Sequence, residues 1–369
     1  MSSDDRKISE PEPGRDAEPV PCPVAEEKVI VIGRPEEGEW VFAGPRPRPR
    51  YRLALALFIA TCLSTFVVGF LGDGLPALFH FKPEELRVLF TRQLGVRVGH
   101  GVLYTCCLMA ILSAHELGHY LQARRYGVPA SLPLFIPFPI SPIGTMGAVI
   151  VQRPGVADRK AMFDIAITGP LAGLVLAVPL AWWGVATAKV GYAVPTPGHP
   201  VTVFADPLLL KWFIRLTHGA IPVGADIGLN PILFAGWVGI FITAPNLIPI
   251  GQLDGGHILY CLIGKKAHRV ARGLFLLAAG TVTLSIFFGD RRYAVWTAML
   301  FLIFLIGTRH PPTANDRVPL GTVRRVLGTL TLLFVFIGLT PTPVYEIEAR
   351  PAHRPQVRAV DEVNTDRAP

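Results

Sequence analysis

The chain has 369 residues, of which 51% are hydrophobic and only 17% are charged, and its mean hydropathy is +0.43. These values lie outside the usual range of soluble globular chains and indicate that lipid is the solvent for most of the protein. The net charge of +8 does not indicate nucleic-acid binding, because the basic residues lie beside apolar stretches and no nucleic-acid-binding motif accompanies them. The cysteine count, which is five, is odd and argues against a disulfide framework.

The first 50 residues are polar and rich in proline, so they predict a polar, largely disordered N-terminal segment. Within it, Lys28–Gly44 could form a small hairpin. A polar C-terminal tail is expected at 341–369.

The middle of the chain contains apolar stretches close to the roughly 20 residues that a helix needs to cross a bilayer. They cover residues 53–72, 99–122, 164–187, 229–249, 270–288, 293–308 and 321–340. The stretch 293–308 is short and could pair with 270–288 as a hairpin. We therefore predict an all-α polytopic membrane protein with about six to seven transmembrane helices, an intramembrane core at 51–310 and an additional span at 311–340.

Lys and Arg are more frequent in the loops that would share a membrane face with the N-terminus. The positive-inside rule then places the N-terminus in the cytoplasm. We predict a bacterial plasma membrane as the location, with an organelle membrane as the alternative. Two amphipathic stretches, Pro83–Leu94 and Pro207–His218, are expected to lie at the membrane interface.

The stretch 99–122 contains the sequence HELGH, His115 to His119. On a helix, His115 and His119 lie one turn apart on the same face, where two imidazoles can bind one zinc ion. The adjacent Glu116 can accept a proton from the attacking water. Chance produces such a motif in some chains, but three ionisable side chains inside an apolar helix need a compensating partner, and a metal ion provides one.

A catalytic zinc ion commonly has three protein ligands, and Asp254 is the predicted third. It follows Pro249 and Gly251, which break the helix after the stretch 229–249. Asp254 could instead cap the following helix, and His257 is a rival third ligand. Asn246 either stabilises an oxyanion or forms a hydrogen bond that joins two helices.

Leu132–Gln152 is apolar, but its prolines exclude a continuous helix. We predict a re-entrant, strand-like hairpin near the zinc site, whose edge could pair with an unwound substrate. The alternative is a kinked packing segment without substrate contact.

With HELGH in one span and NLIPIGQLDGG in a later one, the chain resembles the site-2 protease family of intramembrane zinc metalloproteases. TGPLAG (Thr168–Gly173) and PIGTMGAVI (Pro142–Ile150) add to the resemblance, which covers residues 53–310. It implies that His115, His119 and Asp254 bind one zinc ion per chain, with Glu116 as the general base. The chain is similar to the compact bacterial, archaeal or plastid members, without a recognisable PDZ domain or nucleotide-sensing CBS modules.

The resemblance predicts an endopeptidase that cleaves single-span membrane proteins within or near their transmembrane segment. One alternative is an inactive zinc-binding protein that sequesters membrane clients, which the intact Glu116 disfavours. The other is a transporter, which predicts matching broken helices in two halves of the chain; only one break is evident in the sequence.

Overall fold

The computed structural model describes residues 30–32, 41–43, 50–72, 83–91, 93–152, 155–192 and 201–347. Residues 1–46 form a unit of their own, in which β1 (Ile30–Ile32) pairs antiparallel with β2 (Val41–Ala43). The hairpin predicted within Lys28–Gly44 is thereby confirmed. The predicted disorder of the first 28 residues and the polar tail beyond residue 347 fall outside the described residues.

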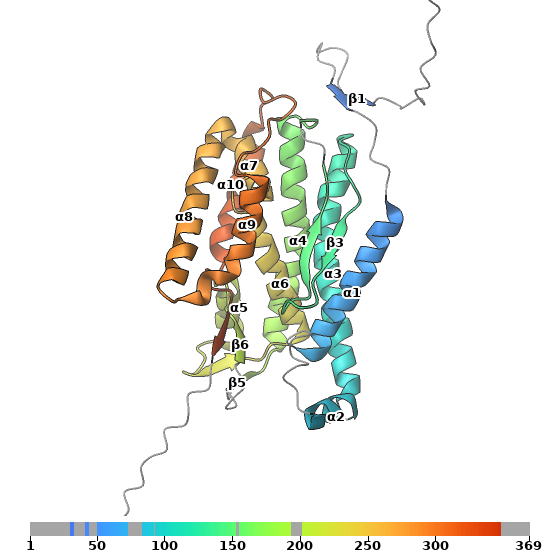
Figure 1. Ribbon diagram of the computed structural model, residues 1–369, viewed down its shortest axis with the longest axis vertical. Coiled ribbons are helices and arrows are strands. Elements are labelled where there is room, and N and C mark those ends of the chain that lie inside the picture. Colours follow the sequence, from blue (N-terminus) through green and yellow to red (C-terminus); the bar gives the residue numbers. More distant parts are fainter. Residues whose placement is uncertain are drawn as a thin grey trace, which may run out of the picture. The chain divides into compact units, whose positions relative to one another are not determined.

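The second unit, which begins at Pro47, is mostly helical (Figure 1). In the described part of the chain, five helices are long and apolar enough to cross a membrane: α1 (Tyr51–Leu71), α3 (Leu94–Arg125), α4 (Arg159–Thr187), the nearly continuous α7–α8 (Asp254–Phe287) and α10 (Gly321–Gly338). Two shorter apolar helical segments are α6 (Pro231–Asn246) and Arg292–Ile306, the latter containing α9 (Thr297–Ile306). Every predicted apolar stretch coincides with one of these helices.

Small residues allow α4 and α6 to pack closely at the centre of this unit. A Cβ on Gly236 would lie only 2.5 Å from the backbone nitrogen of Ala181, and one on Gly239 would lie 2.9 Å from the Ala177 methyl group. Close backbone approach through Gly and Ala is typical of helix pairs in membranes, where burial of apolar surface provides little drive for association. Helix α3 packs against both α4 and α6, so their close contact sets the position of α3.

A short hairpin lies beside α3 and α1, formed by β3 (Leu134–Pro137) and β4 (Thr145–Val149). Leu134 pairs with Val149, and the register becomes irregular towards Pro137, which has no N–H to donate to the ladder. Helix α1 holds the turn of the hairpin, because Ser64 Oγ donates a hydrogen bond to the Gly144 carbonyl at 2.5 Å. Gly144 has φ +82° and lies against the α1 backbone, so this position requires glycine.

Short strands and amphipathic helices lie outside the membrane-spanning helices of this unit. Strand β5 (Val190–Tyr192) pairs with β7 (Ala225–Ile227), and β6 (Val201–Phe204) pairs with β8 (Val344–Ile347). The two amphipathic stretches form helices α2 (Pro83–Thr91) and α5 (Leu208–His218). The β6–β8 pair joins the segment after α10 to the middle of the chain.

Candidate metal centre

The two histidines of the HELGH motif lie on one face of α3, as their spacing predicts. His115 is 5% exposed and His119 is 7% exposed, and their Nε2 atoms lie 3.2 Å apart. Both imidazole edges thus point to the same small volume, although the residues are four positions apart in sequence.

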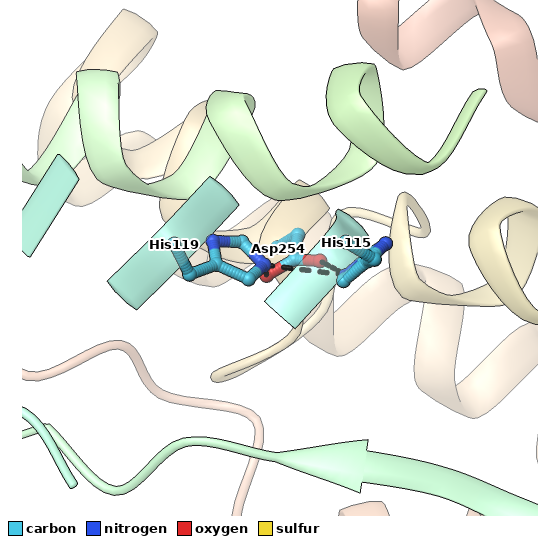
Figure 2. A group of neighbouring side chains, drawn as sticks. All are labelled: His115, His119 and Asp254. Carbon is cyan, nitrogen blue, oxygen red and sulfur yellow. Dashed lines mark hydrogen bonds and ion pairs between the residues drawn. The ribbon is translucent and has the colours of Figure 1, made fainter. Parts of the chain in front are cut away.

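Asp254 reaches this volume from a separate segment of the chain. Helix α6 ends at Asn246, the chain turns through Pro249 and Gly251 (φ +58°), and α7 (Asp254–Ile263) begins at Asp254. Asp254 Oδ2 lies 3.3 Å from His115 Nε2, and Oδ1 lies 3.3 Å from His119 Nε2 (Figure 2). The residue that caps α7 is Leu253, so the Asp254 carboxylate is not used as a helix cap.

The three side chains fit a zinc ion by chemistry and by proximity. One ligand atom from each of them lies within 4.8 Å of the other two. Nitrogen and carboxylate oxygen are donors that zinc prefers, and three protein ligands leave a position for water or substrate. Asp254 and Glu116 would place two negative charges in an apolar cavity, where a divalent cation compensates them.

A hydrogen bond that His119 donates to the backbone of α4 orients its ring. Its Nδ1 lies 2.8 Å from the carbonyl oxygen of Ile165, which is buried. A carbonyl can only accept, so Nδ1 carries the proton and Nε2 keeps its lone pair for a metal. The hydrogen bond therefore selects the tautomer that can bind zinc.

The glycines of the TGPLAG sequence on α4 leave space for the two imidazoles. A Cβ on Gly169 would overlap the ring of His119, and one on Gly173 would lie 3.2 Å from His115 Cβ. On α3, a Cβ on Gly118 would lie 2.7 Å from the Thr168 carbonyl oxygen, which allows the close approach of α4. In the sequence, TGPLAG served only as part of the family resemblance, and its glycines had no assigned role. Gly169 and Gly173 are four residues apart, as the two histidines are, and this equal spacing could have identified the contact between the glycines and the imidazoles.

A cavity of about 420 Å³ surrounds this cluster. Its walls come from α3, α4, α6, α7, α9, the hairpin β3–β4 and the turn before α7. The predicted site residues among its lining are His115, Glu116, His119, Asn246, Asp254 and His257. The structure therefore brings every predicted site residue to one cavity.

The remaining predicted residues differ in their contacts. Glu116 is 6% exposed and follows His115 on α3. Asn246 is half-buried at the end of α6, and no hydrogen bond joins its side chain to another described residue. The ring of His257 contacts His310, with 2.5 Å between His257 Nδ1 and His310 Nε2, and His257 is not part of the three-residue cluster.

A buried histidine–aspartate–histidine set on apolar helices, with a glutamate beside it, contains the residue types of a metalloprotease centre inside a membrane protein. Comparison with known proteins gives the family. Residues 103–287 match the model of peptidase family M50. The chain belongs to this family, the site-2 proteases.

Several plant proteins are similar to this chain. It is 31% identical over 266 residues to a protein of Oryza sativa subsp. japonica named probable zinc metalloprotease EGY1, chloroplastic, covering 70% of this chain and 43% of that protein. It is 32% identical over 238 residues to probable zinc metalloprotease EGY2, chloroplastic, of Arabidopsis thaliana, covering 63% of this chain and 40% of that protein. The chain thus spans less than half the length of these relatives, which are themselves named as zinc metalloproteases.

The same comparison corrects the predicted location. A bacterial plasma membrane was predicted in preference to an organelle membrane, but the similar proteins are named chloroplastic. The prediction is wrong, and the relatives point to a chloroplast membrane. The charge bias distinguishes the two faces of a membrane and contains no information about which membrane it is.

Proposed function

We propose that the chain is a zinc-dependent intramembrane endopeptidase that cleaves single-span membrane proteins within or near their transmembrane segment. The observation that carries the proposal is the meeting of His115, His119 and Asp254 beside Glu116 in a cavity at the level of the apolar helices. In this proposal the three residues bind one zinc ion per chain. The location of the cluster on apolar helices supports a substrate that is itself embedded in the membrane.

When bound, zinc would polarise the scissile carbonyl and lower the pKa of water towards neutrality. The Glu116 carboxylate accepts the proton from the attacking water and returns it to the leaving amine. The Asn246 amide lines the same cavity and is free to donate a hydrogen bond to the developing oxyanion. Asp254 and His119 hold their positions through α7 and the Ile165 carbonyl.

The hairpin β3–β4 supplies a place for the substrate backbone. Residues Met146 to Ile150 line the cavity, and the two-stranded sheet leaves the outer edge of β4 without a strand partner in the described part of the chain. An extended peptide can add to such an edge through main-chain hydrogen bonds. We propose that the hairpin re-enters the membrane and holds the substrate in this extended form, because a helical amide is protected from attack.

The test is cleavage of a purified single-span substrate in proteoliposomes by wild type and by Glu116→Gln. The amide keeps the size of the side chain but cannot accept the proton, so we expect full zinc content and a rate reduced at least about 100-fold, the lower end of general base contributions. Glu84→Gln, an exposed position on α2, is the matched control and should cleave normally. His115→Ala and Asp254→Ala should lose zinc, measured by metal analysis of the purified proteins.

Cleavage by Glu116→Gln at the wild-type rate would reject the role of Glu116. Full zinc content in Asp254→Ala would reject the ligand set. An active wild type that contains no zinc would reject the proposed chemistry altogether.

A further inference from the structure

The C-terminal helix α10 has no role in the proposed function so far. It begins at Gly321, beyond residues 103–287 that the family model matches. Its contacts, however, lead to both segments that hold the proposed zinc ligands.

The first contact is an ion pair at the start of α10. Arg324 Nε donates to Asp164 Oδ1 at 2.7 Å, and an Nη donates to Oδ2 at 2.8 Å. Such a two-point pair fixes orientation as well as distance. The Tyr126 hydroxyl donates to the same Oδ2 at 2.5 Å, so the carboxylate of Asp164 on α4 joins α10 to the C-cap residue of α3. The Asp164 side chain is 14% exposed, and that of Arg324 is 33% exposed.

This ion pair lies directly beside the support of His119. Asp164 precedes Ile165, whose carbonyl holds His119 Nδ1. Tyr126 is the C-cap residue of α3, the helix that carries His119. A shift of Asp164 along α4 would therefore move the Ile165 carbonyl relative to the imidazole that it orients.

The second contact lies one helical turn further along α10. A Cβ on Gly328 would lie 2.6 Å from the Phe163 ring of α4 and 3.3 Å from Ile258 Cγ2 of α7. Phe163 and Ile258 are fully buried, and Ile258 is one turn after Asp254. Helix α10 thus touches both the helix that orients His119 and the helix that carries Asp254.

We propose that Arg324 is a positioning residue for the zinc centre, acting through Asp164 and Tyr126 to fix α3 and α4 in register around His119. The inference rests on the proposed zinc site. It makes α10 part of the catalytic unit, although the helix contributes no ligand and no residue to the cavity wall in the described part of the chain.

The test measures zinc affinity of the purified full chain by competition with a chelator, for wild type and for Arg324→Met. Removing hydrogen-bond partners that orient metal ligands typically weakens metal binding about 10–100-fold, and we expect about 10-fold here because Arg324 acts through the backbone of α4. Arg324→Lys keeps the positive charge but lacks the planar guanidinium that pairs with both carboxylate oxygens, so its zinc affinity should be about 3-fold lower than that of wild type. Arg325→Met, at an exposed neighbouring position, is the matched control and should bind zinc as wild type does.

A second readout separates positioning from general stability. Cobalt(II) substituted for zinc absorbs visible light according to its ligand geometry, so its spectrum should change in Arg324→Met and stay unchanged in Arg325→Met. The rate constant kcat should fall while KM stays constant, because the β4 edge is untouched.

Tyr126→Phe removes the hydroxyl that joins α3 to Asp164 and keeps the ring, so it replaces Arg324→Met if that variant does not fold. Wild-type zinc affinity and an unchanged cobalt spectrum in Arg324→Lys, Arg324→Met and Tyr126→Phe would overturn the positioning role and leave the zinc centre intact. A wild-type chain that binds no zinc would refute both this inference and the proposed function.

Discussion

Replacing Gly169 by alanine tests the packing of α4 against the proposed zinc ligands. The added Cβ would overlap Nε2, Cδ2 and Cε1 of the His119 ring. Non-bonded heavy atoms pack best at about 3.5–4.0 Å, and all three ring atoms would lie well inside that separation. The ring cannot simply move away, because Ile165, one turn earlier on the same helix, holds Nδ1 at 2.8 Å.

The structure predicts a large effect on zinc and a small one on folding. Relief of the overlap must rotate the imidazole or separate α3 from α4, whereas zinc–ligand distances tolerate changes of only about 0.2 Å. We therefore expect zinc affinity to fall by more than about 100-fold, the upper end of the effect of losing an orienting partner. Overpacking costs about 1–3 kcal/mol, and replacing a helical glycine returns about 0.5–1 kcal/mol, so the free energy of unfolding should fall by roughly 0–2.5 kcal/mol.

Two further glycines provide a graded series. A Cβ on Gly173 would lie 3.2 Å from His115 Cβ, an overlap of a few tenths of an ångström, so Gly173→Ala should weaken zinc binding only several-fold. A Cβ on Gly280 of α8 (Ala267–Phe287) would meet nothing within 4 Å, so Gly280→Ala should bind zinc as wild type does. Chelator competition and thermal unfolding of the three variants provide the measurements. Equal zinc affinity in Gly169→Ala and Gly280→Ala would refute the role of this close contact.

Two other predictions concern the hairpin and the opposite end of the molecule. Ser64→Ala removes the hydrogen bond to the Gly144 carbonyl, worth about 1 kcal/mol, so cleavage of a single-span substrate should slow about 5-fold with zinc content unchanged; an unchanged rate would contradict a role for the hairpin. Burial, followed by the nearby Asp226, raises the pKa of Asp206 from 3.8 to about 6. Because the folded protein then binds this proton more tightly than the unfolded chain, stability should fall as pH rises from about 4 to about 6. Asp206→Asn should remove that part of the dependence of the melting temperature on pH, and a slope equal to that of wild type would contradict the assignment.

The sequence predicted the helices because hydrocarbon thickness sets their length and composition. Each apolar stretch coincides with a helix, and the predicted break after the stretch 229–249 appears as the turn between Asn246 and Asp254. The predicted helix ends were less accurate. Helix α3 extends from Leu94 to Arg125, beyond the predicted 99–122, because a search for apolar residues does not detect its polar ends. Helix α7 is not among the predicted apolar stretches because its 10 residues are too few to form a stretch of membrane-spanning length.

The relative positions of helices depend on contacts that no local pattern contains. Asp254 was predicted to join His115 and His119 from the helix break that precedes it, and the resemblance, which links the two distant motifs, supported that prediction. Arg324 and Asp164 are 160 positions apart, and nothing in either segment identifies its partner. The same holds for the Ile165 carbonyl, because every residue has a carbonyl and only the register of α3 against α4 selects this one.

Helix α4 donates none of the proposed ligands, yet the geometry of the centre depends on it. Its glycines accommodate both imidazoles, its Ile165 carbonyl selects the His119 tautomer, and its Phe163 ring lies between α10 and the interior. Pro170 within α4 has no N–H, so the carbonyl of Ala166, one turn earlier, loses its helical partner. Ala166 itself is among the residues that line the cavity. A side chain added to the α4 face that packs against α3 would displace a zinc ligand without binding zinc itself. Selection for zinc geometry should therefore restrict the residues allowed on this face of α4 as strongly as it restricts the ligands.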